Sequence, residues 1–167
     1  MLSYLVSSLG FIIAMILQYG IVSRIPLLSG TADVILLFVA AWSLHQNKRY
    51  SWMVVLLFAL IISLISAMPL FLPLIVYMVI FLVASSLKMR VWQTPLLSMF
   101  VLTFFGTLFQ HGLYLIGLFV QGVSFSWAEV FANIVLPSVL LNMLLAIPVH
   151  ALVQEMTRNL YPVGLEI

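Results

Sequence analysis

Six long apolar stretches separated by short gaps dominate this chain of 167 residues. Hydrophobic residues make up 65% of the sequence, and the charged residues, only 6%, lie almost entirely in the gaps. A helix needs about 20 predominantly apolar residues to cross a hydrocarbon core roughly 30 Å thick, so six crossings use most of the chain. The pattern predicts an all-α membrane protein, a bundle of six transmembrane helices without a soluble domain.

We expect a single integral membrane domain over residues 1–167. The predicted spans cover about 4–22, 32–44, 52–67, 70–87, 95–120 and 130–153. The second is short enough to be re-entrant, so five crossings is the alternative count. No removable signal peptide is expected, because apolar sequence follows Met1 directly, without a basic segment or a small-residue cleavage site.

The basic residues fall in alternate gaps, which predicts that both termini are cytoplasmic. Lys48, Arg49, Lys88, Arg90 and Arg158 lie on one side, and Arg24 alone lies on the other. Tryptophans flank the gaps at positions where an amphipathic ring is stable at a membrane interface. These are Trp42, Trp52 and Trp92 on the basic side and Trp127 on the other.

Polar and small residues recur at helical spacing in three of the predicted spans, which places them on single helix faces. The fifth span has Thr103, Thr107, Gln110, Tyr114, Gly117 and Gln121, with His111 and Gly106 beside them. The sixth has Ser138, Asn142, Ala146 and His150, and the first has Ser7, Gly10, Ala14 and Gln18. The opposite face of the fifth span is bulky and apolar, with Leu102, Phe105, Phe109, Leu113 and Phe119. We expect the polar faces to point toward protein or a cavity and not toward lipid.

Two interpretations of these polar residues stay open. Small and polar side chains let helices approach and hydrogen-bond across an interface, at about 1 kcal/mol or less per bond. Alternatively, Gln110, His111, Tyr114 and Asn142 line a pocket for a lipid or a small molecule, since polar groups in hydrocarbon are costly and often functional. For His111, a satisfied interior imidazole is favoured over a proton relay, because no second titratable group lies at similar depth.

Asp33 begins the second span, and Glu129 begins the sixth. A carboxylate at a helix N-terminus caps free N–H groups and meets the positive end of the helix dipole. Pairing with Arg24, or contact with a partner, are the alternatives for Asp33. In the sixth span, Pro137 and Pro148 are expected to bend the helix by removing backbone hydrogen bonds.

The residues needed for catalysis do not come together in this sequence, and we expect no enzymatic activity and no cofactor. No carboxylate pair, Ser–His–Asp set, metal-ligand cluster or glycine-rich phosphate loop can be assembled. The lack of cysteine excludes disulfides and thiolate chemistry. An ion-coupled transporter is disfavoured as well, because no acid lies in the middle of a span. The pI near 9.2 reflects topology and not nucleic-acid binding.

Several short motifs resemble the MreD family of bacterial rod-shape proteins over nearly the whole chain. They include Gln18-Tyr19 at the end of the first span, the run 32–37 opening the second, and the basic turn Asn47-Lys48-Arg49. The last span adds Leu136-Pro137-Ser138, Leu141-Asn142 and Ile147-Pro148-Val149. Family members often have a proline where this chain has Ala32, and a third span with glycine and an acid, which 58–67 lacks.

The resemblance implies a non-enzymatic scaffold of the cell-elongation machinery in the bacterial inner membrane. Its implied partners are MreC, the synthase RodA with a class B penicillin-binding protein, and, indirectly, MreB. On this hypothesis the outer segments 24–33 and 124–129, with a helix face, hold the transmembrane helix and stem of MreC. A membrane lipid is the expected occupant of any pocket in the bundle, and a homodimer through a small-residue face is also compatible with the sequence.

The resemblance also implies a fold similar to the substrate-binding subunits of energy-coupling-factor vitamin transporters, which supply the alternative function. Such a subunit would bind a vitamin in an outward cavity and contact a coupling module, often through small residues of its first helix. The face formed by Ser7, Gly10 and Ala14 is compatible with such a contact and equally with ordinary packing.

Overall fold

The computed structural model describes residues 2–45, 48–90 and 95–160, and over these residues the chain is helical apart from turns and loops. Asn47, Trp92 and the tail 161–167 lie outside the described residues, as do the side chains of Lys48, Arg49, Lys88 and Arg90. Only some of the tryptophans and basic residues that predict the topology therefore lie within the described structure.

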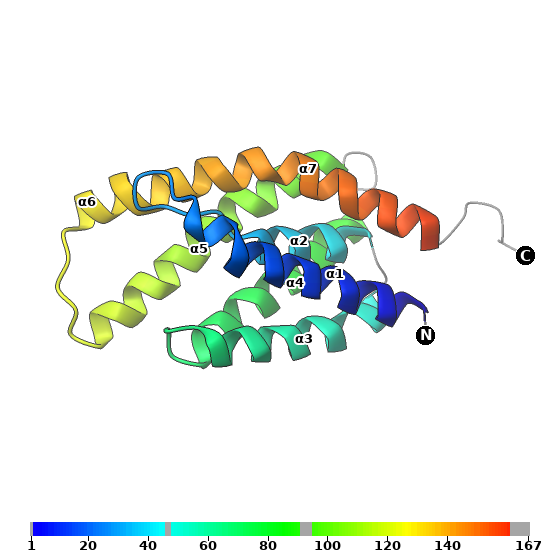
Figure 1. Ribbon diagram of the computed structural model, residues 1–167, viewed down its shortest axis with the longest axis horizontal. Helices are drawn as coiled ribbons and strands as arrows, with labels where there is room; N and C mark the ends of the chain where they lie inside the picture. Colours follow the sequence, from blue (N-terminus) through cyan, green and yellow to red (C-terminus); the bar gives the residue numbers. More distant parts are fainter. Residues whose placement is uncertain (1, 46–47, 91–94, 161–167) are drawn as a thin grey trace, which may run out of the picture.

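Six helices of twelve residues or more form the described fold, together with three short helical turns (Figure 1). The helices are α1 Leu2–Gly20, α2 Val34–His45, α3 Lys48–Ile65, α4 Phe71–Arg90, α5 Pro95–Val120 and α7 Leu136–Leu160. The short turns are η1 Val22–Arg24, α6 Trp127–Val130 and the π-helical η2 Phe131–Val135, which runs directly into α7. These helices follow the six predicted apolar segments in order.

Three of the helical segments are long and apolar enough to cross a membrane: Tyr4–Arg24, Pro95–Val120 and Trp127–Arg158. The other apolar helical segments, Val34–His45, Trp52–Ile65 and Phe71–Leu87, are shorter. The 12 residues of α2 rise about 18 Å, well short of a hydrocarbon core. The helix α2 alone is therefore shorter than a hydrocarbon core is thick, and the crossing of the second span stays a prediction.

The short helix α2 is the centre of the molecule (Figure 1). Every residue from 34 to 44 is buried, and α1, α4, α5 and α7 pack around it. A helix that is hydrophobic on all sides belongs inside a protein or a membrane, because it has no polar face to offer to water. The apolar run after Asp33 thus supplies a core helix around which the longer helices assemble.

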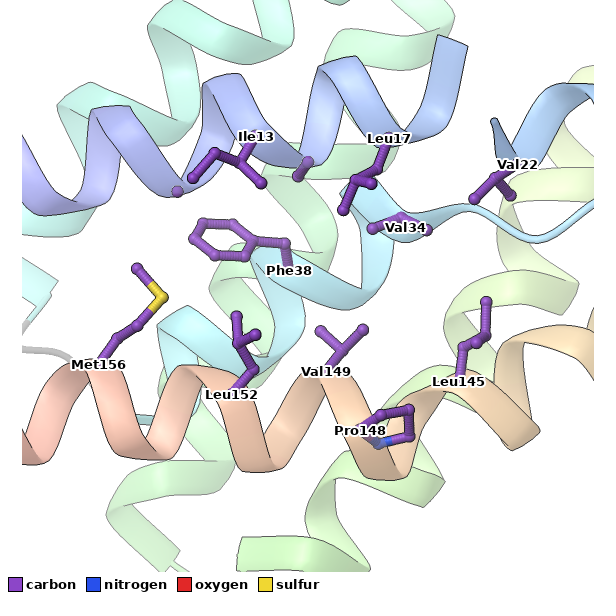
Figure 2. A pocket seen from close by; sticks show the side chains of 12 residues that line it. Ile13, Leu17, Val22, Val34, Phe38, Leu145, Pro148, Val149, Leu152 and Met156 are labelled. Atoms are coloured by element: carbon purple, nitrogen blue, oxygen red, sulfur yellow. The ribbon is translucent and has the colours of Figure 1, made fainter. Parts of the chain in front are cut away.

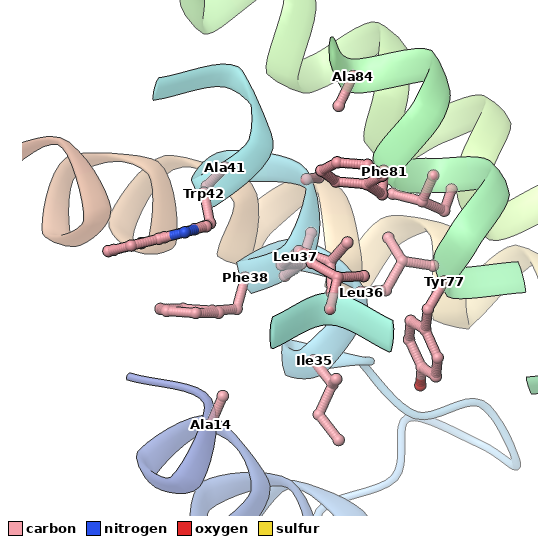
Figure 3. Close-up of a cluster of buried hydrophobic side chains, with 14 of the residues drawn as sticks. Ala14, Ile35, Leu36, Leu37, Phe38, Ala41, Trp42, Tyr77, Phe81 and Ala84 are labelled. Carbon is pink, nitrogen blue, oxygen red and sulfur yellow. The ribbon is translucent and has the colours of Figure 1, made fainter. Parts of the chain in front are cut away.

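Aromatic side chains form much of the core on one side of α2 (Figure 3). The ring of Phe38 lies 4.8 Å from Phe11 of α1 and 5.7 Å from Trp42, measured between ring centroids. Phe11 also stacks on Phe58 of α3 at 4.8 Å. The prediction that Trp42 lies at a membrane interface is wrong: it is 1% exposed, because α2 is enclosed by its neighbours. Trp127, in contrast, is exposed at the start of α6.

The polar and small faces predicted from helical spacing point into the bundle. Ser138, Asn142, Ala146 and His150 of α7 are buried, as are Thr103, Thr107 and Gln110 of α5 and Ser7, Gly10 and Ala14 of α1. On α5 the buried stripe ends near Tyr114, and Gln121 is exposed. One residue of the expected bulky outer face, Leu102, is buried instead and belongs to the core, whereas Phe105 and Phe119 are exposed.

Candidate functional site

The loop from Ile25 to Asp33, between η1 and α2, is folded tightly against the first turns of α7 (Figure 1). Its tip is closed by two backbone hydrogen bonds between Leu27 and Gly30, each 2.9 Å long. Leu28, inside this turn, has φ 56°, a left-handed conformation that is unfavourable for leucine. The loop tip is therefore a hydrogen-bonded turn in which Leu28 has a strained backbone conformation.

Alternate residues of this loop donate their backbone N–H groups to α7 and the π-turn before it. Ser29 donates to the Asn133 carbonyl at 3.0 Å, Thr31 to Ser138 Oγ at 3.1 Å, and Asp33 to Asn142 Oδ1 at 2.7 Å. An extended segment turns every second residue to the same side, which explains this alternation. The four-residue spacing of Ser138 and Asn142 on α7 thus serves to hold the loop.

Pro137 explains why the Asn133 carbonyl is free to accept the N–H of Ser29. In a regular α-helix the carbonyl of Asn133 would accept the N–H of residue 137, which a proline lacks. The chain forms the π-turn η2 just before Pro137, and the Asn133 carbonyl accepts Ser29 N–H instead. Pro137 therefore leaves a backbone carbonyl free, as predicted, and this carbonyl binds the loop.

Gly30 lies where the loop backbone meets the helix backbone. A Cβ atom added there would lie 2.6 Å from the Ile134 carbonyl oxygen and 2.8 Å from the Ser138 backbone nitrogen. Backbone atoms of a packed helix cannot shift at low cost, so any side chain at this position pushes the loop away from α7.

The carboxylate of Asp33 links α2 to two further helices. Its Oδ1 accepts the N–H of Leu36 at 2.8 Å, which is the capping role predicted from the sequence. Its Oδ2 accepts Tyr77 Oη–H of α4 at 3.0 Å and Gln110 Nε2–H of α5 at 2.6 Å. The alternative pairing with Arg24 is not formed, and Arg24 is exposed on η1.

Asn142 extends the network between α7 and α5. Its Nδ2 donates to Thr107 Oγ1 at 2.9 Å, and the Thr107 hydroxyl donates to the Thr103 carbonyl at 2.7 Å. Asn142 is fully buried, and its amide oxygen and its amide nitrogen each form a hydrogen bond. The side chain consequently fixes both the position of Asp33 and the pairing of α5 with α7.

Gln18 holds the same segment from the side of α1. Its Nε2 donates to the Ala32 carbonyl at 3.0 Å, and its Oε1 accepts the N–H of Val34 at 2.8 Å. These two hydrogen bonds fix the backbone at the start of α2 to α1. We call Gln18, Asp33, Tyr77, Thr107, Gln110 and Asn142 the polar centre. Hydrogen bonds link the last five to one another, and Gln18 binds the backbone on both sides of Asp33.

The predicted site residues divide into two groups. Asp33, Gln110 and Asn142 come together in the polar centre, and Pro137 supports the adjoining loop. Tyr114 is half-buried, packs against the core and lies within electrostatic range of Asp33. His111 stays apart: its Nδ1 lies 2.9 Å from the Thr107 carbonyl of its own helix.

Three members of the polar centre, Gln18, Tyr77 and Thr107, were not predicted as site residues. Tyr77 is a single aromatic hydroxyl in the otherwise apolar first half of α4, and it has no polar neighbours at helical spacing. Gln18 and Thr107 belong to the predicted polar faces of the first and fifth spans, and Gln18 also to the motif Gln18-Tyr19. For Tyr77 the signal was an isolated polar group in a predicted span, which must find a partner when buried.

Most polar atoms of the polar centre form hydrogen bonds within it. Among its described members, the buried acceptor without a hydrogen-bond partner is Gln110 Oε1. No group of three or more His, Asp or Glu within residues 2–45, 48–90 and 95–160 is arranged to hold a metal ion. The arrangement joins α1, α2, α4, α5 and α7 at one point and presents no activated nucleophile.

Comparisons of the chain with protein-family models, curated proteins and solved structures found no match. The functional argument therefore rests on the geometry of this fold and on the motifs in its sequence.

Proposed function

We propose that this chain is a multi-pass protein of the bacterial inner membrane with cytoplasmic termini, and that it is a non-enzymatic scaffold similar to MreD. In that role it holds MreC and helps to couple MreB to peptidoglycan synthesis by RodA and its class B penicillin-binding protein. The short motifs described above support this proposal, together with three helical segments of membrane-spanning length.

The observation that carries the scaffold proposal is the docked loop between η1 and α2. Ile25, Leu27 and Leu28 are 67%, 45% and 69% exposed, and the following residues Ser29 and Thr31 fix the loop to η2 and α7 by hydrogen bonds. A fixed apolar tip binds a partner without a further entropy cost for ordering the loop. We propose that this tip is the contact with the MreC stem.

The polar centre supports a scaffold more than a carrier. A vitamin-binding subunit needs convergent polar groups that remain available to a substrate. Here the groups at the middle of the bundle bind one another, and the predicted coupling face of Ser7, Gly10 and Ala14 is buried against the rest of the chain. Both observations disfavour the transporter alternative.

The variant that tests this proposal is Leu28→Asn. Asparagine tolerates the left-handed φ of this position better than leucine, so the loop should keep its fold while its most exposed apolar side chain is lost. We expect an unchanged or slightly higher melting temperature and a clear loss of co-purified MreC. The matched control is Leu64→Asn, an exposed leucine near the end of α3, which should retain MreC.

The measurement is affinity purification of the tagged chain from its native membrane in mild detergent, followed by mass spectrometry. Equal recovery of MreC from wild type, Leu28→Asn and Leu64→Asn would remove the loop tip from the interface. Recovery of a paired ATPase with a coupling membrane subunit, and no MreC, would replace the scaffold by the vitamin-transport alternative.

A further inference from the structure

A groove of about 280 Å³ runs between α1 and α7 (Figure 2). Both helices pack on α2, and Phe38 of α2 forms the floor. Ile13 and Leu17 line the α1 side, and Val149 and Leu152 line the α7 side. All of the lining residues are apolar, so the groove offers no side-chain anchor for a soluble ligand.

The shape and lining of the groove limit its occupant. The groove is open along one side and is bounded by α1, α2 and α7, so a narrow, flexible apolar chain can lie in it. An extended acyl chain needs no polar anchor, which suits a groove lined only by apolar side chains. The fit is to part of one acyl chain.

A charge lies at one end of this groove. Val22 of η1 lines the groove, and Arg24, two residues further on, is exposed and forms no ion pair with any described residue. Arg24 is also the only Lys or Arg in the three connections at this end of the molecule, between α1 and α2, α3 and α4, and α5 and α6. A guanidinium binds a phosphate well, and at the edge of a membrane it meets the lipid headgroups.

We propose that the groove between α1 and α7 is a binding site for one glycerophospholipid, with an acyl chain against Phe38 and the phosphate at Arg24. The lipid completes the packing of α1 against α7, because a groove left empty inside a bilayer would forfeit the contacts of its lining atoms. Arg24 adjoins Ile25 of the loop tip proposed to bind MreC, but the acyl-chain part of the site lies between α1 and α7. Variants in the groove therefore test the lipid independently of MreC.

The first experiment is native mass spectrometry of the full chain, purified from its membrane and washed extensively in mild detergent. We expect one retained phospholipid per chain in the wild type. Complete absence of phospholipid from the wild type would overturn the proposal. A lipid-free dimer that dissociates when the groove is filled would also overturn it, and would assign the groove to a second copy of the chain.

Variants that fill the groove from opposite walls test its location. Val149→Trp and Ile13→Trp should each cause a loss of most of the retained phospholipid, because the new ring takes the place of the acyl chain and removes its contacts with the groove. The control is Leu144→Trp, which puts the same ring on an exposed position of α7 outside the groove and should retain the lipid. Equal retention in all three folded variants would overturn the assignment.

The headgroup contact has its own test, which does not depend on the core. Arg24→Gln changes an exposed side chain and should leave the melting temperature unchanged. When phosphatidylglycerol competes with uncharged diacylglycerol, the wild type should prefer phosphatidylglycerol, and Arg24→Gln should lose most of that preference. An unchanged preference would refute the role of Arg24.

Discussion

The two ends of α2 are held in different ways. At its N-terminus, Asp33 is joined to Tyr77, Gln110 and Asn142 by hydrogen bonds from three helices. Five residues later, Phe38 begins a region held by ring contacts with Phe11 and Trp42. In a bilayer, lipid tails are as apolar as leucine, so helix association depends on close packing and hydrogen bonds. We infer that the polar end specifies which helices meet, whereas the aromatic end supplies most of the contact.

Removal of an aromatic ring should have the largest effect. Phe38→Ala leaves a void between α1, α2 and the groove, and we expect a loss of about 3 kcal/mol in unfolding free energy, the low end of the range for large core truncations. Lipid can cover part of the void, which moderates the loss. Thermal and denaturant unfolding in mild detergent measure it, with exposed Phe105→Ala as the control. Equal losses in the two variants would contradict a core role for Phe38.

Displacing the docked loop should have the second largest effect. Gly30→Ala places a Cβ against the backbone of α7, and we expect a loss of about 2 kcal/mol, within the range for overpacking. The matched control is Gly112→Ala on α5, where nothing lies within 4 Å of the new Cβ. That variant should be more stable than wild type by about 0.5 kcal/mol, since alanine favours a helix. A tolerated Gly30→Ala would mean that the loop is not fixed to α7.

Loss of the buried amide should have a similar or slightly smaller effect. Asn142→Leu removes the acceptor for Asp33 N–H and the donor to Thr107, and two hydrogen bonds in a membrane interior are together worth about 1–2 kcal/mol. Gln154→Leu, an exposed amide of the same helix, is the control. If the two variants unfold at the same temperature, the polar centre does not stabilise the fold.

Neutralising the carboxylate should have the smallest effect. In Asp33→Asn the new amide can still cap α2, and rotation of the Gln110 amide would give its now unpartnered Oε1 a donor. We expect a loss of about 1 kcal/mol or less, whereas Asp33→Leu should lose more, because three donors are left without an acceptor. A loss as large in Asp33→Asn as in Asp33→Leu would show that the charge itself is required.

The helices were predictable because their cause is local. Long apolar runs, with prolines and charges between them, define where helices begin and end, and helical spacing defines which face of each is polar. The buried faces of α5 and α7 follow from that spacing, as does the capping role of Asp33, which needs only the free N–H groups of the following turn.

The contacts between helices were decided by the tertiary structure. Spacing along α5 and α7 does not say that Gln110 meets Asp33 or that Asn142 meets both Asp33 and Thr107, because these partners are 35 to 109 residues apart. Trp42 was misplaced for a similar reason: a tryptophan near basic residues resembles an interface residue until the enclosing helices are known. The sequence by itself determined an apolar, all-helical chain with polar stripes, since these depend on neighbours along the chain. The polar centre, the docked loop and the groove depend on the packing of distant helices around α2, which only the assembled fold could define.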